Sequence, residues 1–284
     1  MNEVNSEDMK PCTVCNEPSR IMFARPEGNL YRCGGCDHCF TSLQTMTEQE
    51  TYEADYFDVT HNAWFNNPNT ELFDYILKQI NQLKSGASVI DVGAGRGELL
   101  KYLHRKNSGL ALTGVDLSPI PPAEGITFIQ GDVLAMEVTR RYDVVVSLAV
   151  IEHVFDIHKF VKILGNLCAP DGIIIVMTLN DRSLLYAVTR FMRILGMPGP
   201  FNRVYDKHHV NHFNISSLRR LMAGNQLSIK ETHHHNVPLA AVDIEEGNPL
   251  KRAIFRVGVW GTFVIGALLN KTYLQTIVCG HKKE

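Results

Sequence analysis

Three glycines stand between a β-branched run and a helical pattern, a spacing typical of turns that bind nucleotide-like ligands. In "VIDVGAGRGELL" (residues 89–100) they are Gly93, Gly95 and Gly97. Glycine lets the backbone bend sharply and approach a ligand, and the free N–H groups of the following helix can bind a phosphate or a carboxylate. The dinucleotide fingerprint G-x-G-x-x-G requires a further glycine where this chain has Glu98, so the turn departs from that pattern.

Three carboxylates accompany the turn. Asp91 lies inside the strand before it, Asp116 ends the next expected strand, and Asp132 ends the third. An acid at the second strand end typically binds ribose hydroxyls, and a carboxylate at the third can accept the adenine amino group. Three acids would repel a pyrophosphate, but they suit a phosphate-free ligand that carries a sulfonium and an ammonium group.

The elements that must position these residues alternate between strand and helix. Alternation of this kind predicts an α/β fold with a doubly wound, Rossmann-like, mostly parallel seven-stranded sheet, whose ligands lie beyond the carboxyl ends of the strands. Apolar runs predict strands at 88–92, 110–117, 126–132, 142–149, 173–180, 227–232 and 273–280. Helical spacing predicts helices at 70–84, 97–106, 158–172 (ending in a Pro-Asp-Gly turn), 183–195 and 216–226.

Five segments in this order resemble the class I S-adenosylmethionine-dependent methyltransferases: "VIDVGAGRG", "GVDLSP", "IQGDV", "YDVVVSLAVIEHV" and "LCAPDGIIIVMTLN". The resemblance covers roughly residues 46–280 and predicts a methyltransferase domain at 46–284. It implies that S-adenosylmethionine is the cofactor and that the three glycines line its methionine part. It also implies that Asp116 holds the ribose, Asp132 the adenine and Asp91 the amino end.

Other residues of the cofactor site follow from the same resemblance. Leu117, Val133 and Leu148 lie in the matching segments, so they are expected along the cofactor. Tyr56 lies in the aromatic stretch "EADYFDVTHNAWF", which resembles a segment that closes over the cofactor in relatives. The alternative for this stretch is a packed linker.

Four cysteines near the start of the chain have the spacing of a zinc ribbon. Cys12 and Cys15 form one C-x2-C pair, and Cys33 and Cys36 form a second after a 17-residue spacer. Two such pairs can present four thiolates to zinc tetrahedrally, so a zinc ribbon is predicted over residues 1–45. Cys39 could replace Cys33 as the partner of Cys36 in the second pair. The alternative to a zinc site is a set of reduced cysteines that bind no metal.

Histidines supply candidate general bases, because a hydroxyl acceptor must lose its proton during methyl transfer. His153 follows the fourth strand, where the resemblance places Glu152 and His153 beside the cofactor; the alternative is a structural role at a helix start. In "YDKHHVNHFNISSL" (205–218), His209 matches a histidine common in small-molecule and glycan members, and His212 follows it. Capping and packing are the alternative roles of these two.

The last fifty residues hold two unusual segments. The histidine run in "THHHNVP" (232–238) is expected in a solvated loop, and the alternative is that it lines the acceptor pocket after the sixth strand. The uncharged stretch 257–269 has 13 residues, too few to span a bilayer. A buried helical insertion near 250–270 is the favoured interpretation. The alternative is an interfacial helix, with Lys251, Arg252 and Arg256 at one end, that meets a lipid-linked acceptor at the membrane.

Composition narrows the function. The 284 residues are 45% hydrophobic with a net charge of -2, which is typical of a soluble protein and argues against a dedicated nucleic-acid binder. The first residues lack a secretory pattern, and the cysteines cluster, so a cytoplasmic protein is expected. The predicted function is methyl transfer to a small molecule or glycan, at oxygen and with histidine assistance. RNA base N-methylation and a catalytically inactive cofactor-binding module are the alternatives.

Overall fold

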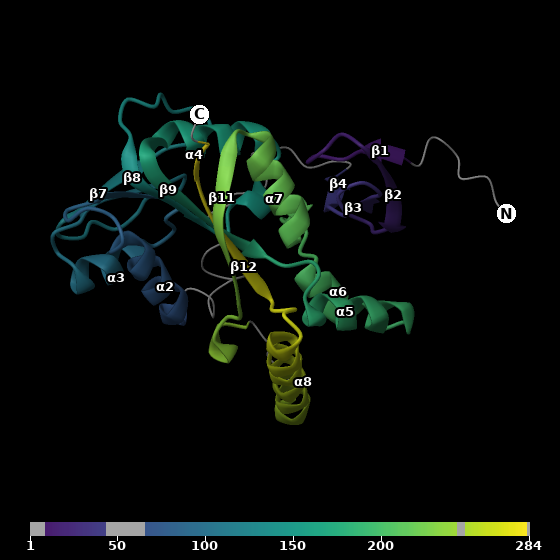
Figure 1. Cartoon of the computed structure of the whole chain (residues 1–284). Helices are drawn as coiled ribbons and strands as arrows, with labels where there is room; N and C mark the ends of the chain where they lie inside the picture. Colours follow the sequence, from purple (N-terminus) through teal and green to yellow (C-terminus); the bar gives the residue numbers. More distant parts are fainter. Residues whose placement is uncertain (1–8, 44–65, 243–247, 283–284) are drawn as a thin grey trace.

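The computed structural model describes residues 9–43, 66–242 and 248–282, and it contains two β-sheets (Figure 1). The larger sheet has the order β11-β12-β9-β8-β5-β6-β7. Strands β7, β6, β5, β8 and β9 are parallel, and β12 is antiparallel to both its neighbours. The predicted mostly parallel seven-stranded sheet is thereby confirmed. Its strands are β5 (Ser88–Val92), β6 (Ala111–Asp116), β7 (Ile126–Gln130), β8 (Tyr142–Leu148), β9 (Cys168–Leu179), β11 (Leu227–His235) and β12 (Leu274–His281).

Helices cover both faces of this sheet, as a doubly wound fold requires. Helices α2 (Thr70–Ile80) and α3 (Glu98–Lys106) pack on one face, and α4 (Ile157–Leu167) and α7 (Ile215–Gly224) pack on the other (Figure 1). Successive residues of β8 alternate between the two cores: Val144 and Val146 belong to the first, and Val145 to the second. Because the central strands are buried on both faces, they are continuously apolar.

Two sequence predictions about local structure were wrong. Helix α4 ends at Leu167, and the expected Pro-Asp-Gly turn lies within β9. There Tyr142 pairs with Cys168 and Val144 with Ile173, so the intervening residues form a bulge.

The histidine run was also assigned wrongly. It forms the end of β11 and not a solvated loop, because the ladder with β12 continues to His235, which pairs with Leu274. The ring of His233 stacks on Tyr75 at 4.2 Å, and His235 Nε2 lies 2.9 Å from Thr276 Oγ1.

Helix α8 (Pro249–Leu268) connects β11 to β12 through η5 (Leu239–Ala241). The favoured prediction of a buried helix was wrong. Val259 and Phe263 are buried, but Trp260 is 57% and Leu268 82% exposed. No other element among the described residues covers the outer side of α8, and it protrudes beyond the sheet (Figure 1). Within the described residues, no helix is long and apolar enough to cross a membrane.

The smaller sheet joins the N-terminal segment to the rest of the chain. Its strands are β1 (Met9–Pro11), β2 (Pro18–Phe23), β3 (Gly28–Cys33), β4 (Cys39–Leu43) and β10 (Asn211–His212), in that order. The fifth strand, β10, lies between β9 and α7 in the sequence and pairs antiparallel with β4. The ribbon-like segment therefore shares hydrogen bonds with the main body, and its boundary near residue 45 lies outside the described residues.

A buried carboxylate strengthens this junction. Asp181 follows β9 and is fully buried. It accepts hydrogen bonds from Arg32 of β3 at 2.8 Å and from Arg190 of α5 (Leu184–Ile194) at 3.1 Å. Tyr205, after α6 (Pro198–Val204), donates a further bond to the same carboxylate. A buried charge with several partners fixes the geometry of the elements that hold it.

Candidate active site

The glycine turn approaches its neighbours so closely that a side chain has no room. Gly93 has a φ of +78°, and a Cβ there would lie 2.2 Å from Cγ2 of Val150. Gly97 has a φ of +74° at the N-cap of α3, and its Cβ would lie 2.8 Å from the ring of Phe128. The turn thus requires glycine both for its left-handed backbone and for the close approach.

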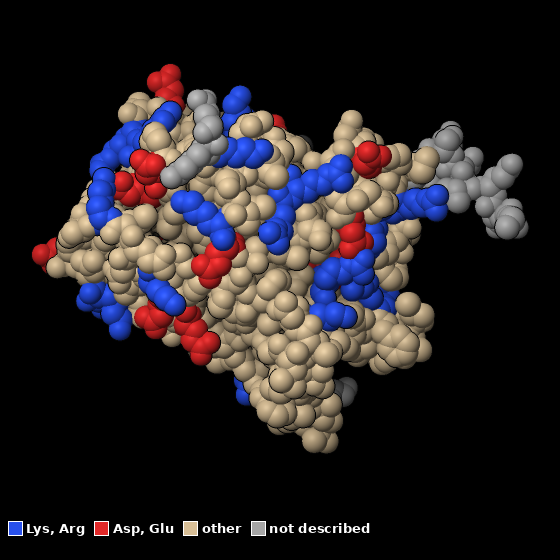
Figure 2. Space-filling model, in the orientation of Figure 1, with Lys and Arg blue, Asp and Glu red and all other residues tan. Residues whose placement is uncertain are grey.

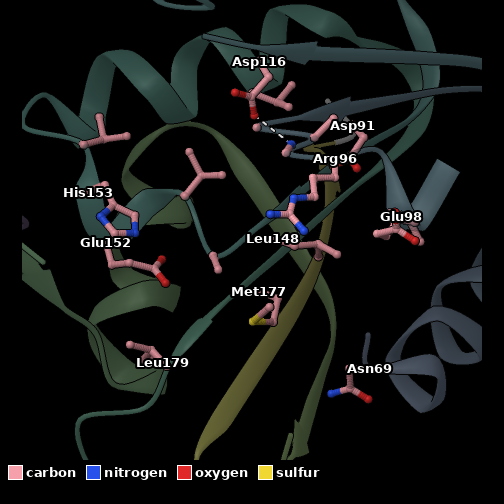
Figure 3. A pocket seen from close by; sticks show the side chains of 18 of the residues that line it. Asn69, Asp91, Arg96, Glu98, Asp116, Leu148, Glu152, His153, Met177 and Leu179 are labelled. Carbon is pink, nitrogen blue, oxygen red and sulfur yellow. Dashed lines mark hydrogen bonds between the residues drawn. The ribbon is translucent and has the colours of Figure 1, made fainter. Parts of the chain in front are cut away.

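A cavity of about 760 Å³ opens at the carboxyl ends of β5, β6 and β8, within the range of small-molecule sites (Figure 3). The structure brings most of the predicted site residues together there. Those lining the cavity are Asp91, Gly93, Gly95, Asp116, Leu117, Asp132, Val133, Leu148, His153 and His209. Gly97 packs beneath the turn, His212 lies elsewhere, and Tyr56 is outside the described residues.

Two of the lining carboxylates differ in their hydrogen bonding. Asp116 accepts the N–H of Gly95 at 2.7 Å and that of Ser118 at 2.9 Å, which fixes it beside the turn. Asp91 is 3% exposed, and its Oδ1 has no hydrogen-bond partner among the described residues. Burial, together with the charge of Asp116, raises the pKa of Asp91 to about 7.

These features fit S-adenosylmethionine. An unpartnered buried carboxylate is costly, and a cationic ligand in the cavity would supply the missing charge and donors. Asp116 presents a fixed carboxylate where a ribose is expected. Asp132 is exposed at the rim, where Oδ1 accepts the N–H of Leu134 at 2.8 Å.

Glu152, His153 and His209 form a buried cluster at a different part of the cavity wall from Asp91 (Figure 3). Each offers a ligand atom within 4.8 Å of the others, and the two imidazole rings are 4.7 Å apart. Residues 151–153 form η4 (Ile151–His153), and the N–H of Val210 bonds to the carbonyl of Glu152 at 2.9 Å. That bond holds the His209 loop against η4, which brings together two histidines distant in sequence.

The polar contacts of the cluster define its protonation chemistry. His153 Nδ1 lies 3.1 Å from the carbonyl oxygen of His208, which can only accept, so Nδ1 carries the proton and Nε2 is the basic nitrogen. Glu152 accepts the hydroxyl of Thr178 at 2.8 Å, and burial raises the pKa of Glu152 to about 7. The cluster can therefore accept a proton near neutral pH, or hold a divalent cation.

His212 has a different environment. It lies in β10, is 2% exposed, and its Nε2 is 3.1 Å from Thr41 Oγ1 of β4. Burial and the neighbouring His209 hold the pKa of His212 well below its ordinary value. Its position is that of a buried residue within the smaller sheet.

Several cavity residues could not be identified from the sequence. Leu179, Val237 and Tyr273 line the end of the cavity away from the glycine turn. They are separated by dozens of residues, and no motif marks them. Glu152 could be identified from the sequence, because the "IEHV" segment resembles the family pattern. Its proximity to His209, however, depends on the tertiary fold.

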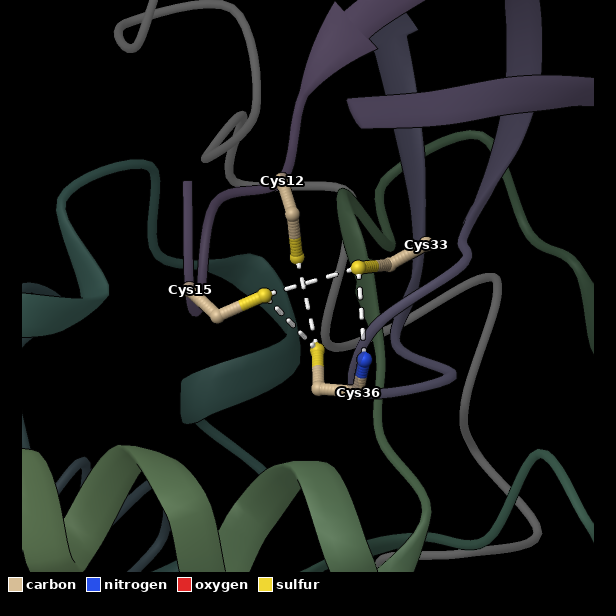
Figure 4. A group of neighbouring side chains, drawn as sticks. All are labelled: Cys12, Cys15, Cys33 and Cys36. Carbon is tan, nitrogen blue, oxygen red and sulfur yellow. Dashed lines mark hydrogen bonds between the residues drawn. The ribbon is translucent and has the colours of Figure 1, made fainter. Parts of the chain in front are cut away.

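Four cysteine sulfurs converge on one point between β1, β2 and β3 (Figure 4). The Sγ atom of Cys15 is 3.4 Å from the Sγ atom of Cys33 and 3.4 Å from that of Cys36. The Sγ atom of Cys12 is 3.6 Å from that of Cys36. A tetrahedral zinc with Zn–S bonds of about 2.3 Å requires sulfurs about 3.8 Å apart, so this arrangement fits zinc. Cys39 is buried in β4 and is not part of the cluster.

Fold and cavity together define the class of S-adenosylmethionine-dependent methyltransferases, and comparison with known proteins agrees. The profile of the family described as "Methyltransferase domain" matches residues 64–232. The chain belongs to this family.

Individual curated proteins match this chain at low sequence identity or over only part of its length. The ubiquinone biosynthesis O-methyltransferase of Azorhizobium caulinodans is 34% identical over 119 residues, which cover 38% of this chain and 46% of that enzyme. The enzyme of the same name from Rickettsia prowazekii is 26% identical over 61% of this chain and 75% of its own length. The match to the first of these thus spans less than half of the relative.

A solved structure shares the fold over nearly the whole chain. The 1,6-didemethyltoxoflavin-N1-methyltransferase of Burkholderia thailandensis, solved with its acceptor and S-adenosylhomocysteine, aligns with a TM-score of 0.56. It covers 93% of this chain and 99% of that chain at 13% identity. Similarity at this level concerns the fold alone.

Proposed function

We propose that the protein transfers the methyl group of S-adenosylmethionine to a hydroxyl oxygen of a small-molecule acceptor, with His153 as the general base. The observation that carries the proposal is the position of the cluster Glu152, His153 and His209 in the wall of the cavity that also holds Asp91 and Asp116. The curated relatives that act at oxygen support the choice of oxygen over nitrogen.

Bound in the cavity, S-adenosylmethionine supplies an activated methyl group. The chain's own residues bind and orient the reactants and move one proton. Nε2 of His153 takes the acceptor's hydroxyl proton as the oxygen bonds to the methyl carbon and the carbon–sulfur bond breaks. The carbonyl of His208 holds the ring and stabilises the imidazolium through Nδ1. The ionised form of Glu152, beside the ring, adds to that stabilisation.

The lining of the cavity favours an acceptor with an apolar body over a glycan. Met177, Leu179, Val237 and Leu274 form the wall beyond the cluster. A sugar would leave its hydroxyls unpaired against these side chains, which costs binding free energy. An aromatic or prenylated alcohol would instead bury apolar surface there.

We further infer that Cys12, Cys15, Cys33 and Cys36 bind structural zinc. The sulfur geometry and the small size of the N-terminal sheet support this, because a segment with little core gains folding free energy from a metal. Loss of the metal would loosen β4, which pairs with β10 directly after the His209 loop.

The experiment compares alkyl-substituted phenols and catechols with the matching anilines, using S-adenosylmethionine labelled in its methyl group. We expect label on oxygen, and a fall in kcat of about 10²-fold to 10⁴-fold in His153→Gln with little change in cofactor affinity. His104→Asn, on α3 outside the cavity, is the matched control and should retain full activity.

Labelling of the anilines alone would refute transfer to oxygen. An unchanged kcat in His153→Gln would refute the assigned base. Activity that disappears with a chelator at a concentration that leaves the cysteine-bound zinc in place would instead assign the cluster to a divalent cation.

A further inference from the structure

The outward side of α8 carries a row of large apolar side chains at helical spacing. Leu250, Ile254, Val257, Trp260, Val264 and Leu268 follow one another every three or four residues and are 41–82% exposed. The opposite side, with Val259 and Phe263, packs on the protein. This helix therefore has an apolar face toward the core and a second apolar face toward the solvent.

Helix α5 extends this apolar face. It packs on α8, and the N–H of Leu184 bonds to the carbonyl of Lys271, three residues after the end of α8, at 3.0 Å. Phe191 is 60% and Ile194 71% exposed, and Leu195 follows them at 58%. We call the outward residues of α5 and α8, from Val188 to Leu195 and from Leu250 to Leu268, the α5–α8 surface. Exposed apolar patches of this kind mark interaction sites.

The helices of this surface carry basic and no acidic side chains, and Asp243, Glu245 and Glu246 precede α8 in the sequence. Residues 182–205 and 248–282 contain no aspartate or glutamate. Arg252 and Arg256 are exposed on α8, and Arg193 lies at the end of α5. Figure 2 shows the protruding lower part of the molecule as uncharged surface with basic side chains near it. A partner with an apolar interior and a negative rim would complement both features.

We propose that the α5–α8 surface docks on a bilayer that contains anionic lipids, with α8 in the plane of the interface. Trp260, at the middle of the exposed row, is a residue type that favours this boundary. A helix that presents apolar side chains and basic residues buries its face at the level of the headgroups without crossing the membrane. A two-fold dimer through the same face is the alternative occupant, and a dimer that is lost in a variant of this face would reveal it.

The cavity lies behind the inward side of α8, opposite this surface. The ring of Phe263 on α8 is 5.8 Å from the ring of Tyr273, and Tyr273 lines the cavity. Ala241 of η5 also lines the cavity, and η5 contacts α8. On the proposed function, this placement points to an acceptor with a long apolar chain that remains in the bilayer while its hydroxyl group reaches His153. The docking itself does not depend on the reaction.

The experiment uses the full chain with Trp64→Phe, which leaves Trp260 as the single tryptophan reporter. The protein is mixed with vesicles of phosphatidylcholine, with or without phosphatidylglycerol, and followed by sedimentation and by fluorescence. We expect sedimentation with the anionic vesicles, together with a blue shift of Trp260 and its protection from a soluble quencher.

Two variants and a control test the surface. Val257→Ser with Leu268→Ser should weaken vesicle binding at least about tenfold, because two apolar side chains no longer enter the bilayer. Arg252→Glu with Arg256→Glu should weaken it by about fivefold or more for each residue, and only on anionic vesicles. Val138→Ser, at an exposed apolar residue far from α8 in sequence, should bind like the parent.

Three results would overturn the proposal: no sedimentation of the parent with anionic vesicles, equal binding by the serine variant, or a dimer that becomes monomeric in that variant. Circular dichroism of each variant checks that it is folded. Binding to vesicles without methylation of any phenol would refute the proposed function and leave the docking intact. Methylation of a phenol without binding to vesicles would refute the docking and leave the proposed function intact.

Discussion

The contact between Gly93 and Val150 allows a quantitative test of the turn. In Gly93→Ala, the new Cβ would lie 2.2 Å from Val150 Cγ2, and the residue would keep a φ of +78°. The left-handed backbone costs about 1–2 kcal/mol for a residue other than glycine. Overpacking of this kind costs about 1–3 kcal/mol more. The expected loss in free energy of unfolding is therefore about 2–5 kcal/mol.

A double-mutant cycle separates the two parts. Val150→Ala removes the methyl groups in the way, so Gly93→Ala in that background should cost only the backbone part, about 1–2 kcal/mol. Urea denaturation followed by far-ultraviolet circular dichroism measures all four proteins. A coupling free energy below about 0.5 kcal/mol would refute the close approach, and a small cost in both backgrounds would refute the backbone assignment as well.

Three further predictions concern charge and metal. Affinity for S-adenosylmethionine should rise with pH through about 7, because protonated Asp91 must lose its proton to pair with a cation. Titration calorimetry should find weaker and pH-independent binding in Asp91→Asn; unchanged binding there would contradict the assignment. Cys33→Ser should lower both the zinc content measured by atomic emission and the Tm, while equal metal content would exclude the cluster as its site. Asp181→Ala should cost about 3–5 kcal/mol in urea denaturation, because Arg32 and Arg190 lose a buried partner, and a loss below about 1 kcal/mol would contradict that.

The sequence was sufficient for the part of the site near the glycine turn. The turn, Asp91 and Asp116 lie within one strand–helix–strand unit, β5, α3 and β6, so their spacing along the chain determines their spacing in the fold. The cysteine pairs are equally local, since each C-x2-C pair lies in a single turn. In both cases the chemistry depends on residues whose relative positions are set by short stretches of backbone.

The part of the site expected to bind the acceptor was harder to predict from the sequence, because contacts between residues distant in sequence form it. His209 reaches His153 through tertiary hydrogen bonds, among them those from Val210 to Glu152 and from His153 to His208, and no periodicity encodes these contacts. The solvent exposure of a helix also cannot be predicted from the hydrophobicity of its sequence. The uncharged stretch of α8 has the composition of a core helix, and it is exposed because nothing in the described part of the chain covers its outer side.

The pairing of β4 with β10 has a consequence for the order in which the chain folds. Phe40 and Asn211 are partners in this ladder, although 171 residues separate them. During synthesis the N-terminal segment leaves the ribosome first, but its sheet can be completed only after most of the methyltransferase domain has emerged. Contacts this distant in sequence slow folding, and they leave the edge of β4 unpaired in the meantime. A metal bound early by the four cysteines would keep that strand in position until β10 arrives.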